Sequence, residues 1–348
     1  MRAGKENGLL LPSVNGITGQ VLTSAGSGIT SWETPMAPGG DTGDLQFNDN
    51  GSLGGASNAV IENGYLRILT GMPNTTAAGG VALGAKDLAG RIMPAFVGPA
   101  GLDVTVQANL GRNRIAQIVP VVGSNSPTLI GQAVTPTGTA TARTPANTSF
   151  FASLPRLGYV AATATGSIAG FRTAPQWWRG SIANAGGFFY SCTFAITNGA
   201  QQASGRAFVG LHSATTTANS EPTALTNAIG MARSVNSNNW VIYGANGTAN
   251  GTLINLGANF PCNTVSSDFY RLTLFSAPAG TSVGWRVERV NAIDSATGQP
   301  FMASGVITNS SQLPTNNVFL AAHGWSSTGT LSGAAGFDLI NLYVETDT

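Results

Sequence analysis

Apolar and polar residues alternate with a period of two through much of the second half of the chain. The clearest run is 188–197, where every even position holds an apolar residue and most odd positions hold a smaller one. Side chains of a β-strand point alternately to its two faces, so this pattern predicts a strand with one buried and one solvated face. Similar runs recur along the chain, at 207–212, 240–243, 270–275, 283–290, 318–323 and 337–345.

Turn-forming residues separate these runs, as in Gly244–Gly247 and Ala277–Gly280. Many short strands joined by such turns are typical of sandwiches and barrels. The sequence therefore predicts an all-β fold in which residues 151–348 form an antiparallel, jelly-roll-like β-sandwich.

The first 86 residues carry shorter patterns. Residues 1–40 are rich in Gly, Ser, Thr and Pro, which is typical of an attachment segment followed by a linker. In 41–86, short alternating segments flank Asn50-Gly51 and Asn63-Gly64, and Asn-Gly favours two-residue hairpin turns. Hairpins of this size are at best marginally stable alone. The predicted β-hairpin stalk therefore needs neighbours, and we expect these to be copies of the same chain.

Residues 87–150 join the predicted stalk to the predicted sandwich. Their pattern predicts one short helix around 102–110, followed by an apolar run at 115–122 and a Thr-, Pro- and Ala-rich passage. We expect a connecting, shoulder-like region here.

Charged residues are scarce, at 9% of the chain against about 25% in ordinary soluble proteins. Lys5 and Lys86 are the only lysines, and Gly, Asn, Ser and Thr are abundant instead. Exposed helices favour Glu, Lys, Ala and Leu, whereas Gly, Asn, Ser and Thr suit strands and turns. The composition excludes a helical bundle and argues against a doubly wound α/β enzyme.

The charge distribution also limits the partners. Sixteen basic and fifteen acidic residues give a net charge of +1, and the longest basic cluster is Arg112-Asn113-Arg114. Nucleic-acid binding needs clustered Lys and Arg to neutralise phosphates, so no nucleic-acid partner is expected. No apolar stretch approaches the roughly 18 residues of a membrane-spanning helix, so no membrane insertion is expected either. The N-terminus lacks a signal-peptide core, and we expect synthesis in a host cytoplasm without an export signal.

Residues that could perform chemistry are few and scattered. Cys192 and Cys262 lie far apart without a CxxC motif and are interpreted as small buried apolar residues. His212 and His323 lack metal-ligand spacing and are interpreted as locally packed strand residues. No metal or other cofactor is predicted.

One short pattern matches a hydrolase motif. Gly280–Gly284 fits the G-x-S-x-G of a nucleophile elbow, and Asp294 and His323 follow in the order of α/β-hydrolases. The elbow requires a sharp turn from a strand into a helix, whereas Ser282 leads from a hairpin loop into a predicted strand. The match therefore does not predict a hydrolase.

Paired carboxylates could support polysaccharide cleavage, because a glycosidase needs two of them about 5–9.5 Å apart. The C-terminal region offers Glu221, Asp268, Glu288, Asp294, Asp338, Glu345 and Asp347. These carboxylates also have ordinary structural explanations, such as Glu288 on a solvated face beside Arg286. We expect a protein without enzymatic activity, with a polysaccharide depolymerase as the alternative.

Aromatic residues near polar loops are the remaining candidates for function. An exposed Trp or Tyr flanked by Asn and Ser offers a neutral sugar an apolar plate together with hydrogen-bonding groups. The candidate glycan-binding residues on this argument are Trp240, Tyr243, Trp325, Trp177 and Trp178. The alternative is that these rings fill the core of the sandwich, and the alternation within 283–290 favours that for Trp285.

Several segments resemble the tail fibres of tailed bacteriophages and prophages. Residues 43–55, GDLQFNDNGSLGG, are similar to a QFND-G-x-x-G element that recurs in such fibres, and 19–32 is similar to another fibre repeat. From Arg91 onward the chain also resembles fibre tips, with markers at 206–211, 270–274, 284–289 and 342–346. Together these segments cover most of the chain.

The resemblance implies a homotrimeric, β-rich fibre within the virion. Its N-terminal segment would attach to the phage tail or baseplate, and its C-terminal end would bind the bacterial surface through a polysaccharide or an outer-membrane receptor. Three tips acting together would convert weak sugar binding into firm attachment through effective concentration. A purely structural fibre or adaptor that docks another tail protein is the further alternative.

Overall fold

The computed structural model describes residues 5–6, 9–24, 29–35, 41, 44–49, 52–63, 65–70, 82–97, 103–105, 114–183, 185–197, 205–248, 251–264 and 266–346. The chain divides into two compact units. The first unit comprises Met1–Lys86 and Ala95–Asp103, and the second comprises Asp87–Pro94 and Val104–Thr348.

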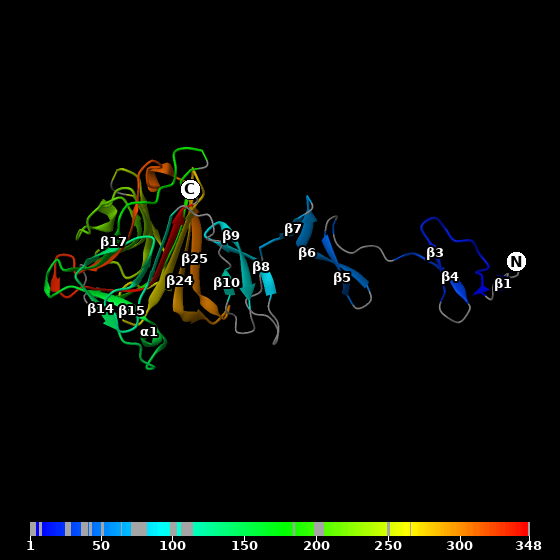
Figure 1. Cartoon of the computed structure of the whole chain (residues 1–348), viewed down its shortest axis with the longest axis horizontal. Coiled ribbons are helices and arrows are strands. Elements are labelled where there is room, and N and C mark those ends of the chain that lie inside the picture. The colour runs from blue at the N-terminus through cyan, green and yellow to red at the C-terminus, as the bar shows by residue number, and fades with distance from the viewer. Residues whose placement is uncertain are drawn as a thin grey trace. The chain divides into compact units, whose positions relative to one another are not determined.

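Small antiparallel sheets make up the first unit, drawn in blue to cyan in Figure 1. Its two smallest sheets pair β1 with β2 and β3 with β4, which span Lys5–Glu6, Leu9–Leu10, Val21–Ser24 and Thr30–Glu33. One aromatic ring organises the β3–β4 hairpin. Trp32 donates from Nε1 to the Val14 carbonyl oxygen at 2.9 Å, and its ring covers Gly16, where a Cβ would come within 2.6 Å.

The next sheet contains the fibre-like motif. β6 (Ser52–Glu62) is its central strand, and β5 (Asp44–Asp49) and β7 (Tyr65–Ile68) pair with it. Strands thus form on both sides of each predicted Asn-Gly turn, and Asn63 has the left-handed φ of 51° that such turns require. Asn50, Gly51 and Gly64 lie outside the described residues.

A three-stranded sheet follows, in the order β10 (Asp103–Thr105), β9 (Arg91–Val97), β8 (Ala82–Leu88). The helix predicted around 102–110 is wrong at Asp103–Thr105, where β-branched Val104 and Thr105 suit an extended strand. The rest of that predicted helix lies outside the described residues. The turn of the β8–β9 hairpin, Asp87–Pro94, belongs to the second unit.

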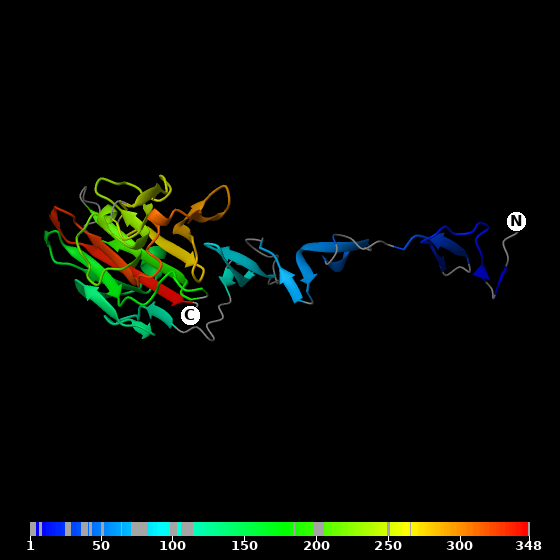
Figure 2. The ribbon, with the colours of Figure 1, turned by 90° about the horizontal axis from the view of Figure 1, so that it is seen from above.

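The second unit is a sandwich of two antiparallel sheets (Figures 1 and 2), which confirms the predicted fold class. The nine-stranded β28 sheet contains β12 (Thr128–Ile130), β11 (Arg114–Val119), β28 (Gly336–Thr346), β18 (Phe188–Thr197), β23 (Phe269–Ser276), β24 (Val283–Asp294), β25 (Gln299–Ile307), β15 (Arg156–Val160) and β14 (Thr139–Arg143). The seven-stranded β26 sheet contains β13 (Val134–Thr137), β17 (Ile168–Thr173), β26 (Ala321–Ser327), β19 (Arg206–His212), β20 (Ala228–Arg233), β21 (Val241–Ala245) and β22 (Thr252–Asn255).

Short elements complete the second unit. β16 (Ala164–Thr165) pairs with β27 (Ser332–Gly333), and the 3₁₀ helices η1 and η2 span Pro222–Ala224 and Ser310–Gln312. α1 (Phe150–Ser153) is the one α-helix among the described residues. No helix in the described part of the chain is long and apolar enough to cross a membrane.

The predicted alternation holds best on β24 and fails on β18. On β24, Val283, Trp285 and Val287 are buried in the core between the sheets, whereas Arg286 and Glu288 face outward. On β18 both faces are buried apart from Ser191, which is half-buried. The expected solvated face is therefore wrong for this strand, because other parts of the second unit cover the outer face of the β28 sheet.

Two short segments provide that cover. The 87–94 turn lies on β18, β23, β24 and β28: Arg91 forms an ion pair with Glu345 and stacks 5.0 Å from the centre of the Phe189 ring. α1 packs its Phe151 with Ala195 and Phe269 in a small separate apolar cluster. A central strand therefore has apolar neighbours on both sides.

Candidate ligand-binding site

Four of the five aromatic residues predicted to bind glycan are buried. The exposed fractions are 0% for Trp177 and Tyr243 and 1% for Trp240 and Trp325. The exposure that the sequence interpretation requires is therefore wrong for these four. A ring that is covered by protein on both faces offers no plate to a sugar.

These rings are buried because they pack into the apolar clusters of the sandwich. Trp240 meets Phe194 and Tyr270 edge-on, with ring centres 5.6 and 5.9 Å apart, in the core between the sheets. Trp325 and Tyr243 belong to a second cluster of buried side chains that includes Phe208 and Leu225. The Tyr243 hydroxyl donates to the Leu225 carbonyl oxygen at 2.7 Å, which satisfies its polar end inside the protein.

Trp178 is the one candidate of the five that remains partly exposed. Its ring packs against Phe319 at 5.4 Å between centres, and Phe319 is 44% exposed. The Arg114 guanidinium lies 5.8 Å from the centre of the Phe319 ring. We call Trp178, Phe319 and Arg114 the Trp178 platform; it keeps the apolar plate and polar neighbour that sugar stacking requires.

The residues of the hydrolase-like motif are not brought together. Ser282 precedes β24 and Asp294 ends it, so Asp294 lies twelve positions further along an extended strand that rises about 3.3 Å per residue. His323 lies on the other sheet at 0% exposure, and its Nε2 donates to the Ala214 carbonyl oxygen at 3.0 Å. This arrangement has no nucleophile beside a base.

Most of the sandwich carboxylates are held in ion pairs. Glu221 pairs with Arg206, Asp268 with Arg289, Glu288 with Arg286, Glu345 with Arg91, and Asp338 with Arg143 and Arg156. Asp294 accepts from the Ala296 N–H, and Asp347 lies outside the described residues. Among the described residues, no group of three or more His, Cys, Asp or Glu is placed to hold a metal ion.

The histidines and cysteines are buried, as the sequence interpretation expected. His212 and His323 lie on neighbouring strands with ring centres 5.2 Å apart. Burial lowers the pKa of His212 from 6.5 to about 4 and that of His323 to about 3. Cys192 and Cys262 are free thiols, and burial raises the pKa of Cys192 to about 12, which keeps it protonated and unreactive.

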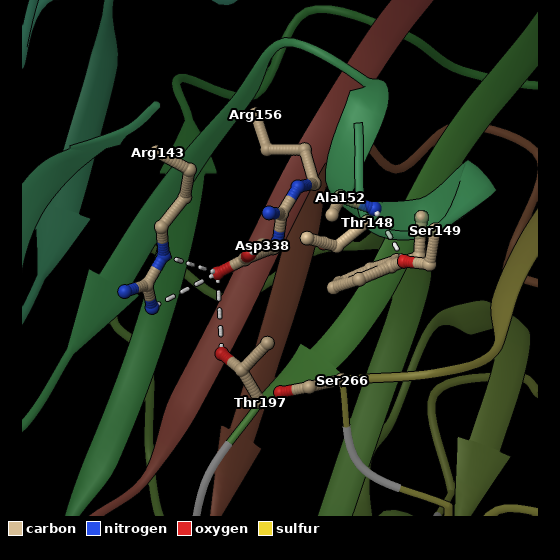
Figure 3. A pocket seen from close by; sticks show the side chains of 9 residues that line it. Arg143, Thr148, Ser149, Ala152, Arg156, Thr197, Ser266 and Asp338 are labelled. Carbon is tan, nitrogen blue, oxygen red and sulfur yellow. Dashed lines mark hydrogen bonds and ion pairs between the residues drawn. The ribbon is translucent and has the colours of Figure 1, made fainter. Parts of the chain in front are cut away.

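A pocket of about 410 Å³ lies on the outer face of the β28 sheet beside α1 (Figure 3). Strand alternation places Asp338 at its base. Phe337 and Leu339 are buried in the core between the sheets, so Asp338 between them points to the opposite face. We call this site the Asp338 pocket.

Two arginines from neighbouring strands cover the Asp338 carboxylate, which is 0% exposed. Arg143 places Nε and Nη2 each 3.2 Å from Oδ1, and Arg156 places Nη1 2.6 Å from Oδ2. Thr197 donates its hydroxyl to Oδ1 at 3.1 Å. Sheet pairing causes this convergence, because Arg143 and Arg156 are cross-strand partners on β14 and β15, and β28 lies between β15 and β18.

The rim of the pocket carries hydroxyl groups. Thr148, Ser149 and Ser266 line it and are exposed. The Ser149 hydroxyl caps α1 by accepting from the Ala152 N–H at 3.1 Å. Ser266 has a φ of 56°, an uncommon conformation for serine that costs energy and is enriched at functional sites.

The Asp338 pocket was missed by sequence reasoning, which considered Asp338 only as one of several carboxylates. A charged residue between Phe337 and Leu339 in an alternating strand was the available signal. The two arginines could not be assigned to it, because they lie 195 and 182 positions away and meet it only through the pairing of β14, β15 and β28.

Neither a protein-family model nor a curated protein matches the chain. Solved structures are similar over about two thirds of the chain. Lectin II from Ulex europaeus is 12% identical with a TM-score of 0.41, covering 68% of this chain and 100% of that one. Peanut lectin is 14% identical with a TM-score of 0.40, covering 67% and 96%. A CBM2 module of the evolved Dit of Lactobacillus casei BL23 phage J-1 is 11% identical with a TM-score of 0.35, covering 68% and 98%. Likeness at this level does not extend to ligands or roles.

Proposed function

We propose that this chain is a bacteriophage tail-fibre protein that attaches the virion to the bacterial surface by binding a surface glycan. The fibre-like segments at 19–32, 43–55 and 91 onward support the fibre role. The observation that carries the proposal is the contrast in burial between the units. The sandwich buries a large core between its two sheets, whereas most of the large apolar side chains described in the first unit are exposed.

The uncovered side chains support a homotrimer. In Met1–Lys86, large apolar residues are 45–78% exposed on successive sheets, namely Val21, Leu45, Phe47, Tyr65, Leu66 and Leu83. Sister copies of the same strands would cover these residues and complete the marginal hairpins. Native mass spectrometry of the full chain should give three times the chain mass. A stable folded monomer at micromolar concentration would contradict this part of the proposal.

Glycan binding belongs to the sandwich in this proposal, with the Asp338 pocket and the Trp178 platform as its two candidate surfaces. The full chain should bind members of a panel of purified bacterial surface polysaccharides and adsorb to the cells that carry them. Trp178→Ala should weaken glycan binding at the platform about two- to tenfold, since an aromatic contact contributes on the order of 0.5–1.5 kcal/mol beyond the area that it buries. Binding to protein-coated but glycan-free surfaces only would favour a purely structural adaptor instead.

The N-terminal segment 1–40 is proposed to attach to the phage tail or baseplate. A chain lacking 1–40 should keep glycan binding but fail to enter virions in a complementation assay. Retained incorporation would place the attachment point elsewhere. We do not propose a depolymerase, because the sandwich carboxylates of the described residues are engaged by arginines or by a turn.

A further inference from the structure

The Asp338 pocket holds more positive than negative charge. Two guanidinium groups share one carboxylate, so the cluster of Arg143, Arg156 and Asp338 carries a net charge of +1. We propose that this pocket binds the carboxylate of an acidic sugar within the bacterial surface glycan. This inference rests on the proposed function and names the class of sugar recognised.

Unused hydrogen-bond donors point to an anionic ligand. A guanidinium has five N–H donors, and the contacts with Asp338 use Nε and Nη2 of Arg143 and Nη1 of Arg156. The Arg156 side chain is only 10% exposed, and its Nε is buried without a partner among the described residues. Arg143 is 27% exposed, so part of its guanidinium faces the pocket and can meet a ligand.

The surrounding groups suit a sugar. A volume of about 410 Å³ falls within the usual range for small-molecule sites. Thr148, Ser149 and Ser266 line the pocket (Figure 3), and their hydroxyl groups can form hydrogen bonds with the hydroxyls of a sugar ring. Phe151 supports Arg156 from behind, with the guanidinium carbon 4.0 Å from the ring centre, and so holds the positive group in place.

The amount of charge favours a carboxylate over a phosphate monoester. A carboxylate is a monoanion, which neutralises the +1 cluster, and its two oxygens match the fork of a guanidinium. A phosphate monoester carries close to two negative charges and would lie beside the buried Asp338 carboxylate with one charge in excess. A sulfate ester is a monoanion of a different shape, so the experiment includes it.

The test measures binding of the full chain to oligogalacturonate by isothermal titration calorimetry at low salt. The matched ligands are neutral galactose oligosaccharides and a sulfated galactan. We expect oligogalacturonate to bind at least tenfold more tightly than the neutral ligand, and 0.5 M NaCl to remove that preference. Arg143→Gln should reduce acidic-sugar affinity at least tenfold. Arg271→Gln is the matched control, since Arg271 is also a partly exposed, ion-paired arginine on the β28 sheet.

Asp338→Asn gives a test with the opposite sign. Removing the carboxylate leaves two uncompensated guanidinium groups, so affinity for the acidic sugar should rise several-fold, and the sugar should raise the melting temperature of this variant more than that of the parent. A merely structural role for Asp338 predicts unchanged or weaker binding. If Asp338→Asn does not fold, the comparison of Arg143→Gln with Arg271→Gln still decides the question.

The outcomes separate the inference from the proposed function. Equal binding of acidic and neutral sugars, preference for the sulfated ligand, or equal effects of the two arginine variants would overturn the inference. Glycan binding and cell adsorption would then still support the attachment role. Binding of oligogalacturonate through Arg143 without adsorption to any bacterial cell would support the pocket and contradict the attachment role.

Discussion

The two units of this chain use the same kind of element with opposite results. In the sandwich, central strands such as β18 are buried on both faces. In the first unit, β7 has three of its four residues exposed. The difference teaches that alternation along a strand is not sufficient for stability, because each apolar face also needs a partner surface. The sandwich supplies that surface from its own chain, and the hairpins do not.

The largest loss of stability is expected from a substitution in the sandwich core. Trp240→Ala removes a fully buried ring that packs on Phe194 and Tyr270. It should lower the free energy of unfolding by about 3–5 kcal/mol, the usual cost of deleting a buried aromatic side chain. Urea unfolding of the full chain followed by fluorescence measures this. A change in glycan affinity with unaltered stability would restore the original assignment of Trp240 as a binding residue.

A second effect comes from the buried histidine pair. His212 and His323 are neutral when folded, because burial holds their pKa values at about 4 and about 3, below the ordinary 6.5. At pH values between the folded pKa values and 6.5, the unfolded chain binds more protons than the folded chain. The free energy of unfolding is therefore highest above about pH 6.5 and falls as the pH drops below it. The loss should amount to a few kcal/mol at pH 5, since each shifted histidine contributes up to about 1.4 kcal/mol per pH unit.

Urea midpoints at pH 7 and pH 5 check this prediction. The charged neighbour is Arg172, the cross-strand partner of His323, which also opposes protonation. The variant His323→Gln should reduce the difference between the two midpoints by about half. An equal difference in parent and variant would assign the acid sensitivity to carboxylate ion pairs instead.

A third, smaller effect concerns the cover on the outer face of the β28 sheet. A Cβ at Gly284 would lie 1.9 Å from the Ala89 carbonyl oxygen. Gly284→Val should therefore displace the 87–94 turn and cost about 1–3 kcal/mol, as overpacking usually does. Hydrogen exchange should show faster exchange at 87–94 in this variant. The exposed Ser304→Val on β25 is the control and should leave those amides unchanged.

These contrasts show which parts of the fold were open to sequence reasoning. Local alternation and turn residues located β18 at its observed bounds and β23, β24 and β28 within one to four residues. Burial on the outer face was not predictable, because it depends on α1 and the 87–94 turn, which pack on β18 from distant parts of the chain. α1 itself was not predicted, and the reason is its length. A four-residue helix capped by Ser149 has too few turns to leave a periodic pattern.

The candidate binding site was even harder to predict from the sequence. Trp240 and Trp325 lie beside polar residues in sequence, yet their rings point into apolar clusters, and neighbouring residues on a strand say nothing about which face is covered. Arg143, Arg156 and Asp338 form a site only because three strands pair in one register. The alternation on β28 could indicate that Asp338 lies on the outer face. Which arginines meet it depends on the long-range pairing of strands, which residue type and spacing do not show.

The smallest effect on sandwich stability is expected from a substitution in the first unit, Phe47→Ala. This variant tests most directly whether the two units differ in their need for a partner chain. Phe47 is 49% exposed in the single chain, and its ring covers Gly54, where a Cβ would come within 2.8 Å. Phe47→Ala should change the unfolding free energy of the sandwich by less than about 0.5 kcal/mol, as exposed substitutions usually do. The same variant should shift native mass spectra from trimer toward monomer, because the side chain removed belongs to the surface that sister copies would cover. Loss of sandwich stability with an intact trimer would show that Phe47 contributes to the fold of one chain and that the hairpins need no partner.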